Sequence, residues 1–150
     1  MDSLRRKLRC ACLALAIALA WSPAAVAGRN FHGPVEAIVL DVIDGDTFLA
    51  EALVWPGQSV RVNVRIRGID APEMKSRCTG ERRAALRARA ALAELIGDAV
   101  VSISNIGGAK YYGRVLADVE TPQGVPVADE MLGQSVVRPY AGGRRKSWCG

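Results

Sequence analysis

The segment RVNVRIRGIDAPE, residues 61–73, decides the fold of this chain. Apolar and polar residues alternate over residues 60–67. The apolar residues are Val60, Val62, Val64 and Ile66, and the polar residues are Arg61, Asn63, Arg65 and Arg67. This period of two predicts a strand with one buried face. The segment ends in two carboxylates, Asp70 and Glu73, on either side of Pro72. Because like charges on one strand face repel, we expect negatively charged groups or a bound anion to lie against the three arginines.

Two apolar stretches precede this strand and complete a meander. Residues 35–41 and 47–54 are rich in valine, isoleucine, leucine and phenylalanine, and Asp44-Gly45-Asp46 lies between them as a turn signal. A second turn, residues 55–59, leads into the segment quoted above. We therefore expect three consecutive strands joined by short turns.

A helix follows the third strand. Residues 81–97 consist mostly of strong helix formers, with Thr79 as the expected N-cap and Gly97 as the expected terminator. An apolar stripe at helical spacing comprises Ala85, Ala88, Leu92, Leu95 and Ile96. The arginines of the helix fall on other faces, so we interpret them as a solvated surface.

The remaining elements suggest a small barrel. Residues 100–103 and 114–119 predict a fourth and a fifth strand, residues 127–132 predict a short second helix, and a basic tail without regular pattern ends the chain. Five short strands with a helix after the third predict an α+β, mainly β, fold. The expected architecture is a five-stranded barrel of the oligonucleotide-binding (OB) type.

The first 27 residues have the pattern of a secretory signal peptide. A basic start, a short apolar run and an Ala-Val-Ala site at residues 25–27 occur in that order. The apolar run is shorter than the roughly 20 residues that a membrane-spanning helix needs. We therefore expect an exported protein, periplasmic or secreted, with a flexible mature N-terminus at 28–33 and one domain at 34–150. We expect a monomer without stable membrane association.

Removal of this peptide lowers the positive charge. Residues 1–27 hold four of the 20 Lys and Arg residues and one of the 15 Asp and Glu residues, which leaves 16 basic and 14 acidic residues. The net charge falls from +5 to about +2. Bulk charge therefore does not predict nucleic-acid binding, and any such prediction depends on where the charges lie.

Two cysteines remain in the mature chain, Cys78 and Cys149. Export places them in a compartment that permits disulfides, so we predict that they pair. Closing a loop of about 70 residues would stabilise the fold by roughly 4 kcal/mol in the chain-entropy model. Two free thiols are the alternative.

Carboxylates and arginines are the residues that could carry chemistry. Asp44, Asp46, Asp70 and Glu73 lie at strand ends, where two segments could bring oxygen ligands to a hard cation such as calcium or magnesium. Aspartates are also ordinary turn residues, and this interpretation stays open. The mature chain has a single histidine, His32, too few ligands for zinc and no phosphate-binding glycine loop. The remaining inventory suits phosphodiester cleavage, in which guanidinium groups and a divalent cation stabilise the charge on phosphorus.

Three motifs in order resemble the staphylococcal nuclease family. They are IDGDT at 43–47, RIRGIDAPE at 65–73 and KYYGRVLADV at 110–119, and the likeness covers about residues 35–140. The resemblance implies an OB-type barrel and a calcium-dependent nuclease. Such enzymes act on DNA or RNA with little sequence preference and leave 3′-phosphate ends.

The resemblance assigns the metal ligands by position. It implies that Asp46 and Asp70 bind Ca²⁺ through carboxylates and that Ala71 binds it through its backbone carbonyl. The best-known family member has threonine where Ala71 stands, and alanine supplies the same carbonyl. Asp44 falls on an acidic position of the second shell.

The catalytic positions also match. Glu73 aligns with the family's catalytic glutamate, usually described as the general base. Arg65 and Arg114 align with the two arginines that hold the phosphate. Tyr112 aligns with a tyrosine near the nucleotide pocket, whereas Tyr111 replaces a lysine there.

Two other classes of function remain open. A catalytically inert OB-fold module could bind nucleic acid without cleaving it, and an exported calcium-binding domain would explain the carboxylates but not the arginines. The five charged positions that the resemblance assigns to metal binding and catalysis are all occupied by the expected residues, which favours the nuclease. They are Asp46, Arg65, Asp70, Glu73 and Arg114. The chain ends before the family's long C-terminal helix, and we expect the Cys78–Cys149 bridge to replace its stabilising role.

Overall fold

The computed structural model describes residues 30–110 and 113–149. The predicted signal peptide and Tyr112 lie outside the described residues. Within these ranges the elements are β1 (Val35–Val42), β2 (Thr47–Trp55), β3 (Gln58–Ile66), β4 (Ile69–Asp70), α2 (Thr79–Ile96), β5 (Val100–Gly108), β6 (Arg114–Glu120), α3 (Val127–Gly133) and β7 (Arg138–Pro139). Among the described helices, no helix is long and apolar enough to cross a membrane.

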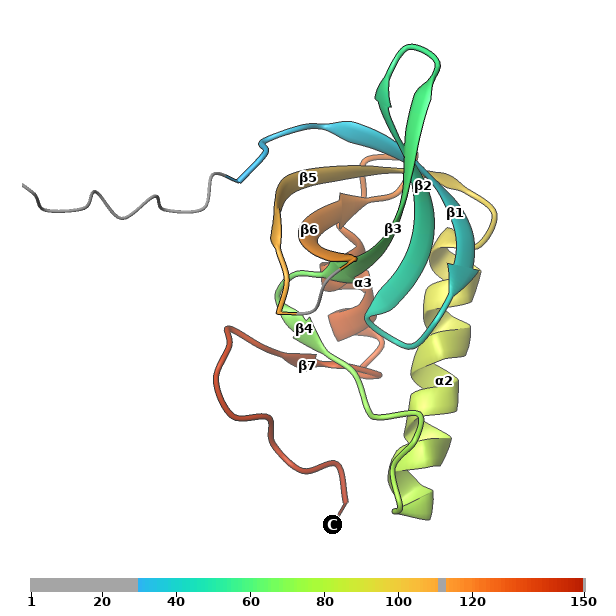
Figure 1. Cartoon of the computed structure of the whole chain (residues 1–150). Helices are drawn as coiled ribbons and strands as arrows, with labels where there is room; N and C mark the ends of the chain where they lie inside the picture. The colour runs from blue at the N-terminus through green and yellow to red at the C-terminus, as the bar shows by residue number, and fades with distance from the viewer. Residues whose placement is uncertain (1–29, 111–112, 150) are drawn as a thin grey trace, which may run out of the picture.

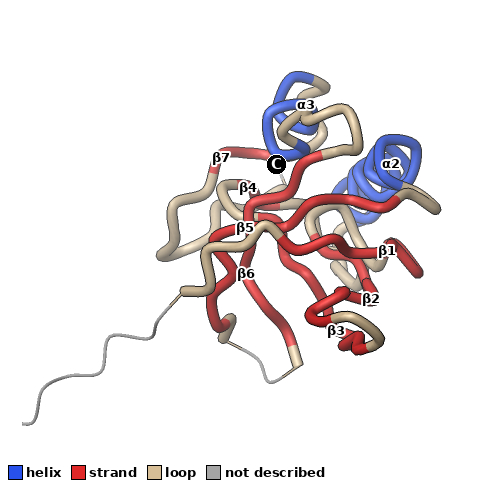
Figure 2. The backbone as a smooth tube through the Cα atoms, turned by 90° about the horizontal axis from the view of Figure 1, so that it is seen from above, coloured by secondary structure: helices blue, strands red, loops and turns tan. Residues whose placement is uncertain are grey.

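Five strands close into a barrel in the order β1-β2-β3-β6-β5 (Figures 1 and 2). The β3–β6 pair is parallel, and the other neighbouring pairs are antiparallel. The strand order and the helix between β3 and β5 confirm the predicted mainly-β barrel of the OB type.

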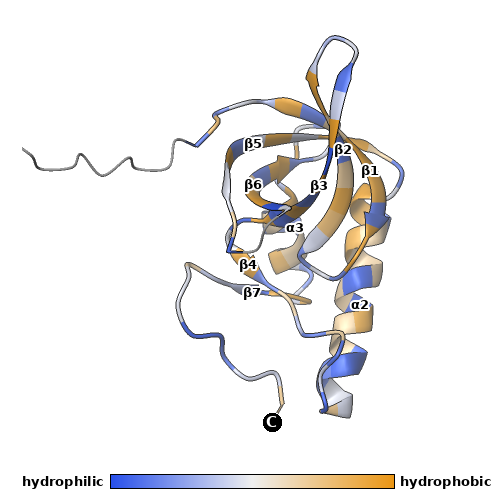
Figure 3. Ribbon diagram, viewed as in Figure 1, coloured by the Kyte–Doolittle hydropathy of each residue, from blue (hydrophilic) through white to orange (hydrophobic). Residues whose placement is uncertain are grey.

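The barrel interior contains the predicted apolar face of each strand. Phe48, Val64 and Ile66 are buried, and Figure 3 shows apolar and polar positions alternating along the strands. Helix α2 lies beside the barrel and contacts β1 and α3. Its apolar stripe is buried at Ala85, Ala88, Leu92 and Ile96, while Leu95 is partly buried against the same core. The helix ends where predicted, at Gly97.

The strands differ most from the prediction at the β2–β3 hairpin, whose turn is residues 56–57 and not 55–59, and at the end of β5. The side chain of Val60 is 49 % exposed, because the hairpin between β2 and β3 extends beyond the barrel (Figure 1). Strand β5 continues to Gly108, five residues past the predicted end, through an irregularity between Ser104 and Gly107. The period of two identifies a strand but does not show where the barrel around it ends.

The N-cap of α2 is Cys78 and not Thr79, so that prediction was wrong. The Cys78 Sγ atom accepts a hydrogen bond from the backbone N–H of Glu81 at 3.4 Å, while Thr79 is the first helical residue. Sulfur is a weak acceptor, and sequence preferences rank threonine well above cysteine as a cap. The neighbouring covalent link to Cys149 fixes Cys78 at this position.

The ends of the described chain both pair with strands. Backbone hydrogen bonds join Phe31 to Ile106, and His32 accepts one from Asn105. The tail, expected to be irregular throughout, forms β7, which pairs with β4 in a separate two-stranded sheet. Two-residue strands have no period that a sequence pattern could display.

Candidate active site

The backbone of the turn between β1 and β2 packs closely against Ala88 and Ala71. Asp44 Oδ1 accepts a hydrogen bond from the N–H of Asp46 at 3.0 Å and fixes the turn. A Cβ atom on Gly45 would lie 2.5 Å from the Cβ of Ala88 in α2 and 2.9 Å from the Cβ of Ala71. Only glycine fits this approach, so the sequence Asp-Gly-Asp places Asp46 between α2 and the segment that follows β4.

Asp46 joins β2, β3 and the segment after β4. Asp46 is 2 % exposed, and its Oδ1 accepts hydrogen bonds from Thr47 Oγ1 at 2.9 Å and from Arg65 Nη1. Its Oδ2 accepts a hydrogen bond from the N–H of Ala71 at 2.8 Å. A buried carboxylate is stable only when it is paired in this way.

Arg65 lies between the two predicted metal aspartates. Besides its ion pair with Asp46, its Nη2 donates to the carbonyl of Ile69 at 3.2 Å and lies 3.8 Å from Asp70 Oδ1. The side chain is 20 % exposed, so solvent reaches the guanidinium. The closest carboxylate partner of Arg65 is therefore Asp46, from another segment, and Asp70 at the end of the quoted segment lies at longer range.

The other two arginines of that strand face have different surroundings. Arg67 donates to Asp118 Oδ1 at 3.0 Å and to the carbonyls of Asn105 and Leu116, so it fastens β3 to its barrel neighbours. Arg61 lies on the exposed part of β3 near the hairpin. Only Arg65 contacts a candidate site residue among the three.

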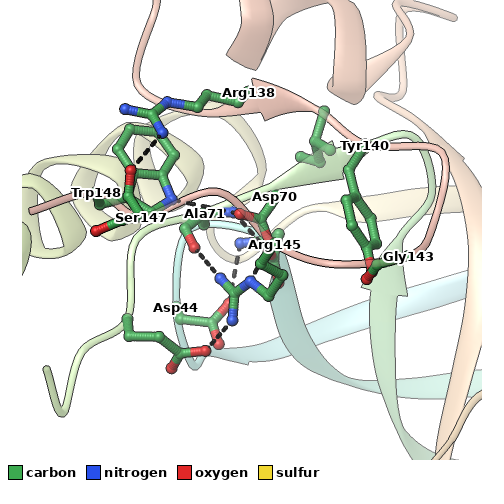
Figure 4. A network of polar contacts seen from close by, with 12 residues as sticks. Asp44, Asp70, Ala71, Arg138, Tyr140, Gly143, Arg145, Ser147 and Trp148 are labelled. Atoms are coloured by element: carbon green, nitrogen blue, oxygen red, sulfur yellow. Dashed lines mark hydrogen bonds and ion pairs between the residues drawn. The ribbon is translucent and has the colours of Figure 1, made fainter.

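Arg145 from the basic tail completes the cluster, and no sequence pattern predicts a role for it at this site. Its Nε lies 2.5 Å from Asp70 Oδ1, its Nη2 donates to the Ala71 carbonyl at 2.5 Å, and its Nη1 donates to Glu73 Oε1 (Figure 4). A sequence signal existed: the predicted disulfide ties this tail to Cys78, five residues after Glu73.

Trp148 in the tail and Glu81 in α2 hold the segment that carries the carboxylates, and neither residue was predicted to do so. Trp148 Nε1 donates to Asp70 Oδ2 at 3.3 Å. Glu81 in the first turn of α2 accepts from the N–H of Glu73 at 3.1 Å and from Ser76 Oγ at 2.6 Å. These bonds hold the backbone of Glu73, while its side chain stays 59 % exposed.

Strand register places Arg114 on the same sheet face as Arg65. The parallel β3–β6 pairing places Arg114 beside Asn63 and Leu116 beside Arg65. Side chains of paired residues share a sheet face, so Arg114 lies on the same face as Asn63. Arg65 is two residues from Asn63 on β3, so its side chain lies on that face as well. The predicted substrate residue Tyr112 falls outside the described residues, two positions before Arg114.

Burial and charge shift two pKa values in the cluster. Burial, followed by repulsion from Asp46, raises the pKa of Asp44 to about 6. For Arg145, burial opposes the charged form, but the ion pairs with Glu73 and Asp70 outweigh it and raise the pKa of the guanidinium. The site therefore strongly favours a positive charge at the position of Arg145.

The predicted disulfide joins Cys78 to Cys149, with Cα atoms 6.1 Å apart. This distance lies within the usual range for disulfides. The link attaches the end of the tail to the N-terminus of α2.

The donor chemistry of the cluster fits a hard cation. Within residues 30–110 and 113–149, no group of three His, Cys, Asp or Glu side chains is gathered as a ready metal cage. However, two of the three residues predicted to bind calcium, Asp70 and Ala71, direct oxygens at one cationic group, Arg145. Asp46 is the third, one hydrogen bond from Ala71. Carboxylate and carbonyl oxygens are the ligands that calcium takes.

Neither a protein-family model nor a curated protein matches this sequence. Site chemistry is therefore the basis for assigning a function. The chain has one histidine, and His32 is bonded through its backbone to Asn105 in β5, so a histidine-based triad has no support in this cluster.

Proposed function

We propose that this chain is an exported, calcium-dependent nuclease of the staphylococcal nuclease type. It would hydrolyse phosphodiester bonds of DNA or RNA with little sequence preference and leave 3′-phosphate ends. One observation carries the proposal: Asp46, Asp70, Ala71, Glu73 and Arg65, from three segments of the chain, lie in one polar cluster at the barrel end. A cluster that combines hard oxygen ligands with guanidinium groups suits an anionic phosphodiester.

Each residue has a role in this proposal. Arg65 and Arg114 bind the phosphate, because a planar guanidinium can donate to two phosphate oxygens and stabilise the charge that develops there. Glu73 orients or deprotonates the attacking water, and its exposed carboxylate is accessible to solvent. Contacts to phosphate carry no base information, which is why we expect little sequence preference.

Asp46, Asp70 and the Ala71 carbonyl would hold the calcium ion. When bound, the ion would supply positive charge to the phosphate oxygens. Asp44 supports this set through its hydrogen bond to the Asp46 backbone, at 3.0 Å. Arg65 already neutralises Asp46 in this structure and would be shared between that carboxylate and the substrate.

Cleavage of labelled single-stranded DNA by the purified protein tests the proposal. We expect degradation with added calcium, loss of activity with a chelator, and products that end in 3′-phosphate. Glu73→Gln should lower the rate by about 10²- to 10⁴-fold, as expected for loss of a general base, and still fold. Glu94→Gln, on the exposed surface of α2, is the matched control and should keep full activity.

Three results would contradict this function. They are cleavage that continues without calcium, a fully active Glu73→Gln variant, and DNA binding without any cleavage. The last result would instead support the inert OB-fold module.

A further inference from the structure

The C-terminal strap, defined as residues 138–149, crosses the carboxylate cluster and is attached at both ends. At its start, Pro139 pairs with Ile69, and the N–H of Tyr140 donates to the Gly68 carbonyl at 2.8 Å. At its end, Cys149 is bonded to Cys78. The strap is therefore held over the site from two sides (Figures 1 and 4).

Contacts within the strap fix its path between these ends. The Arg138 guanidinium lies 3.7 Å from the centre of the Trp148 ring and donates to the Ser147 carbonyl at 2.9 Å. Gly142 and Gly143 have φ values of +101° and +89°, which permit the turn back toward the site. The strap thus brings Arg145 onto the carboxylates in a defined orientation.

Arg145 occupies the position that a bound cation needs. Its guanidinium contacts Asp70 and the Ala71 carbonyl, two of the proposed calcium ligands, and also Glu73, the proposed base. A guanidinium and a calcium ion repel each other and require the same oxygens. Calcium therefore cannot bind with this ligand set unless Arg145 moves away.

We propose that Arg145 is a tethered internal cation that closes the calcium site, and that the Cys78–Cys149 link keeps it there. This inference rests on the proposed nuclease function and assigns the regulation of the same site. While Arg145 is in place, Oε1 of the Glu73 carboxylate is also engaged in this ion pair. Calcium opens the site by displacing the guanidinium, so the metal affinity of the intact protein is lower than its ligands alone would give.

The tether matters because it sets the local concentration of the competing cation. A guanidinium attached through a short loop competes with calcium far better than one on a free tail. Cutting the link should therefore weaken the competition without removing any proposed metal ligand.

Calcium binding measured by titration calorimetry, without nucleic acid, tests the proposal. Arg145→Gln should bind calcium about tenfold more tightly than the oxidised wild type, a typical size for coupling between two ligands. Arg144→Gln, the neighbouring exposed arginine, is the matched control and should bind as the wild type does. Arg145→Lys keeps the charge but loses the planar fork, so its gain should be smaller.

A second comparison tests the tether. The Cys78→Ser and Cys149→Ser double variant, kept folded at low temperature and checked by circular dichroism, should also bind calcium more tightly than the wild type. An unchanged or lower affinity in this variant would overturn the role of the strap.

The results separate the two proposals. If the wild type binds calcium and cleaves DNA but Arg145→Gln shows no gain in affinity, the internal cation is contradicted and the nuclease stands. A weaker calcium affinity in Arg145→Gln would contradict it too, and would indicate that Arg145 supports the site. If the wild type neither binds calcium nor cleaves DNA, both proposals fail.

Discussion

The two proposed metal ligands Asp46 and Asp70 differ in where their partners come from. Asp46 is held by Thr47 and Arg65, which lie in the barrel strands β2 and β3, and by the backbone N–H of Ala71, just after β4. The side chain of Asp70 is held mainly from the strap, by Arg145 and Trp148, more than 70 positions later in the sequence. One half of the site is therefore built into the barrel, while the other half depends on a tail attached by a two-residue strand and one disulfide.

The strongest test of this difference is to cut the tether. Cys78→Ser with Cys149→Ser should lower the free energy of unfolding by about 4 kcal/mol, because the link closes a loop of 71 residues. Urea unfolding measures the loss, and reduction of the wild type should reproduce it. Equal stability with and without the link would show that the strap is held by its other contacts alone.

A change on the barrel side should have the next largest effect. Gly45→Ala should cost about 2 to 3 kcal/mol, because the new methyl group would overlap Ala88 and Ala71. Gly133→Ala, at the end of α3 with open space around it, is the control and should not destabilise the fold. Thermal unfolding compares the two, and equal behaviour would contradict the close packing of the turn.

The smallest effect should come from the charge of Asp44. Its pKa is raised to about 6, so the folded state disfavours the ionised carboxylate. The wild type should therefore lose stability as the pH rises from about 4 through 6, whereas Asp44→Asn should not. The variant should be more stable than the wild type by on the order of 1 kcal/mol at neutral pH, since solvent weakens the repulsion from Asp46.

Urea unfolding of both proteins at about pH 3.5 and pH 7.5, without calcium, measures this difference. The asparagine keeps an oxygen that can accept the bond from the Asp46 backbone. A stability difference that does not grow with pH would contradict the account.

The barrel half could be predicted from the sequence because its signals are local. The period of two in residues 60–67 and the turn signal at Asp44-Gly45-Asp46 define β3 and the start of β2 over short distances. The resemblance added Arg114, whose place depends on a parallel pairing with β3. The pairing of two strands that lie far apart in the sequence cannot be inferred from hydrophobic periodicity.

The strap half could be predicted only in part. Cysteine counting identified the link between Cys78 and Cys149, but the position of Arg145 depends on contacts that leave no pattern in the sequence. Arg144 and Arg145 look alike in the sequence, and only the second contacts the carboxylates. The sequence also carries no local signal for the Cys78 cap, because the neighbouring threonine is the better cap by residue preference.

The most direct test of the central claim is the single-turnover rate of DNA cleavage, with calcium, in two variants of one strand. Arg65→Lys keeps the charge beside Asp46 but loses the planar fork, and we expect the rate to fall by about 10²-fold or more. Arg61→Lys changes an exposed arginine of the same strand and should cleave at the wild-type rate. Equal rates in the two variants, or no cleavage by the wild type, would contradict a phosphodiesterase site at this end of the barrel.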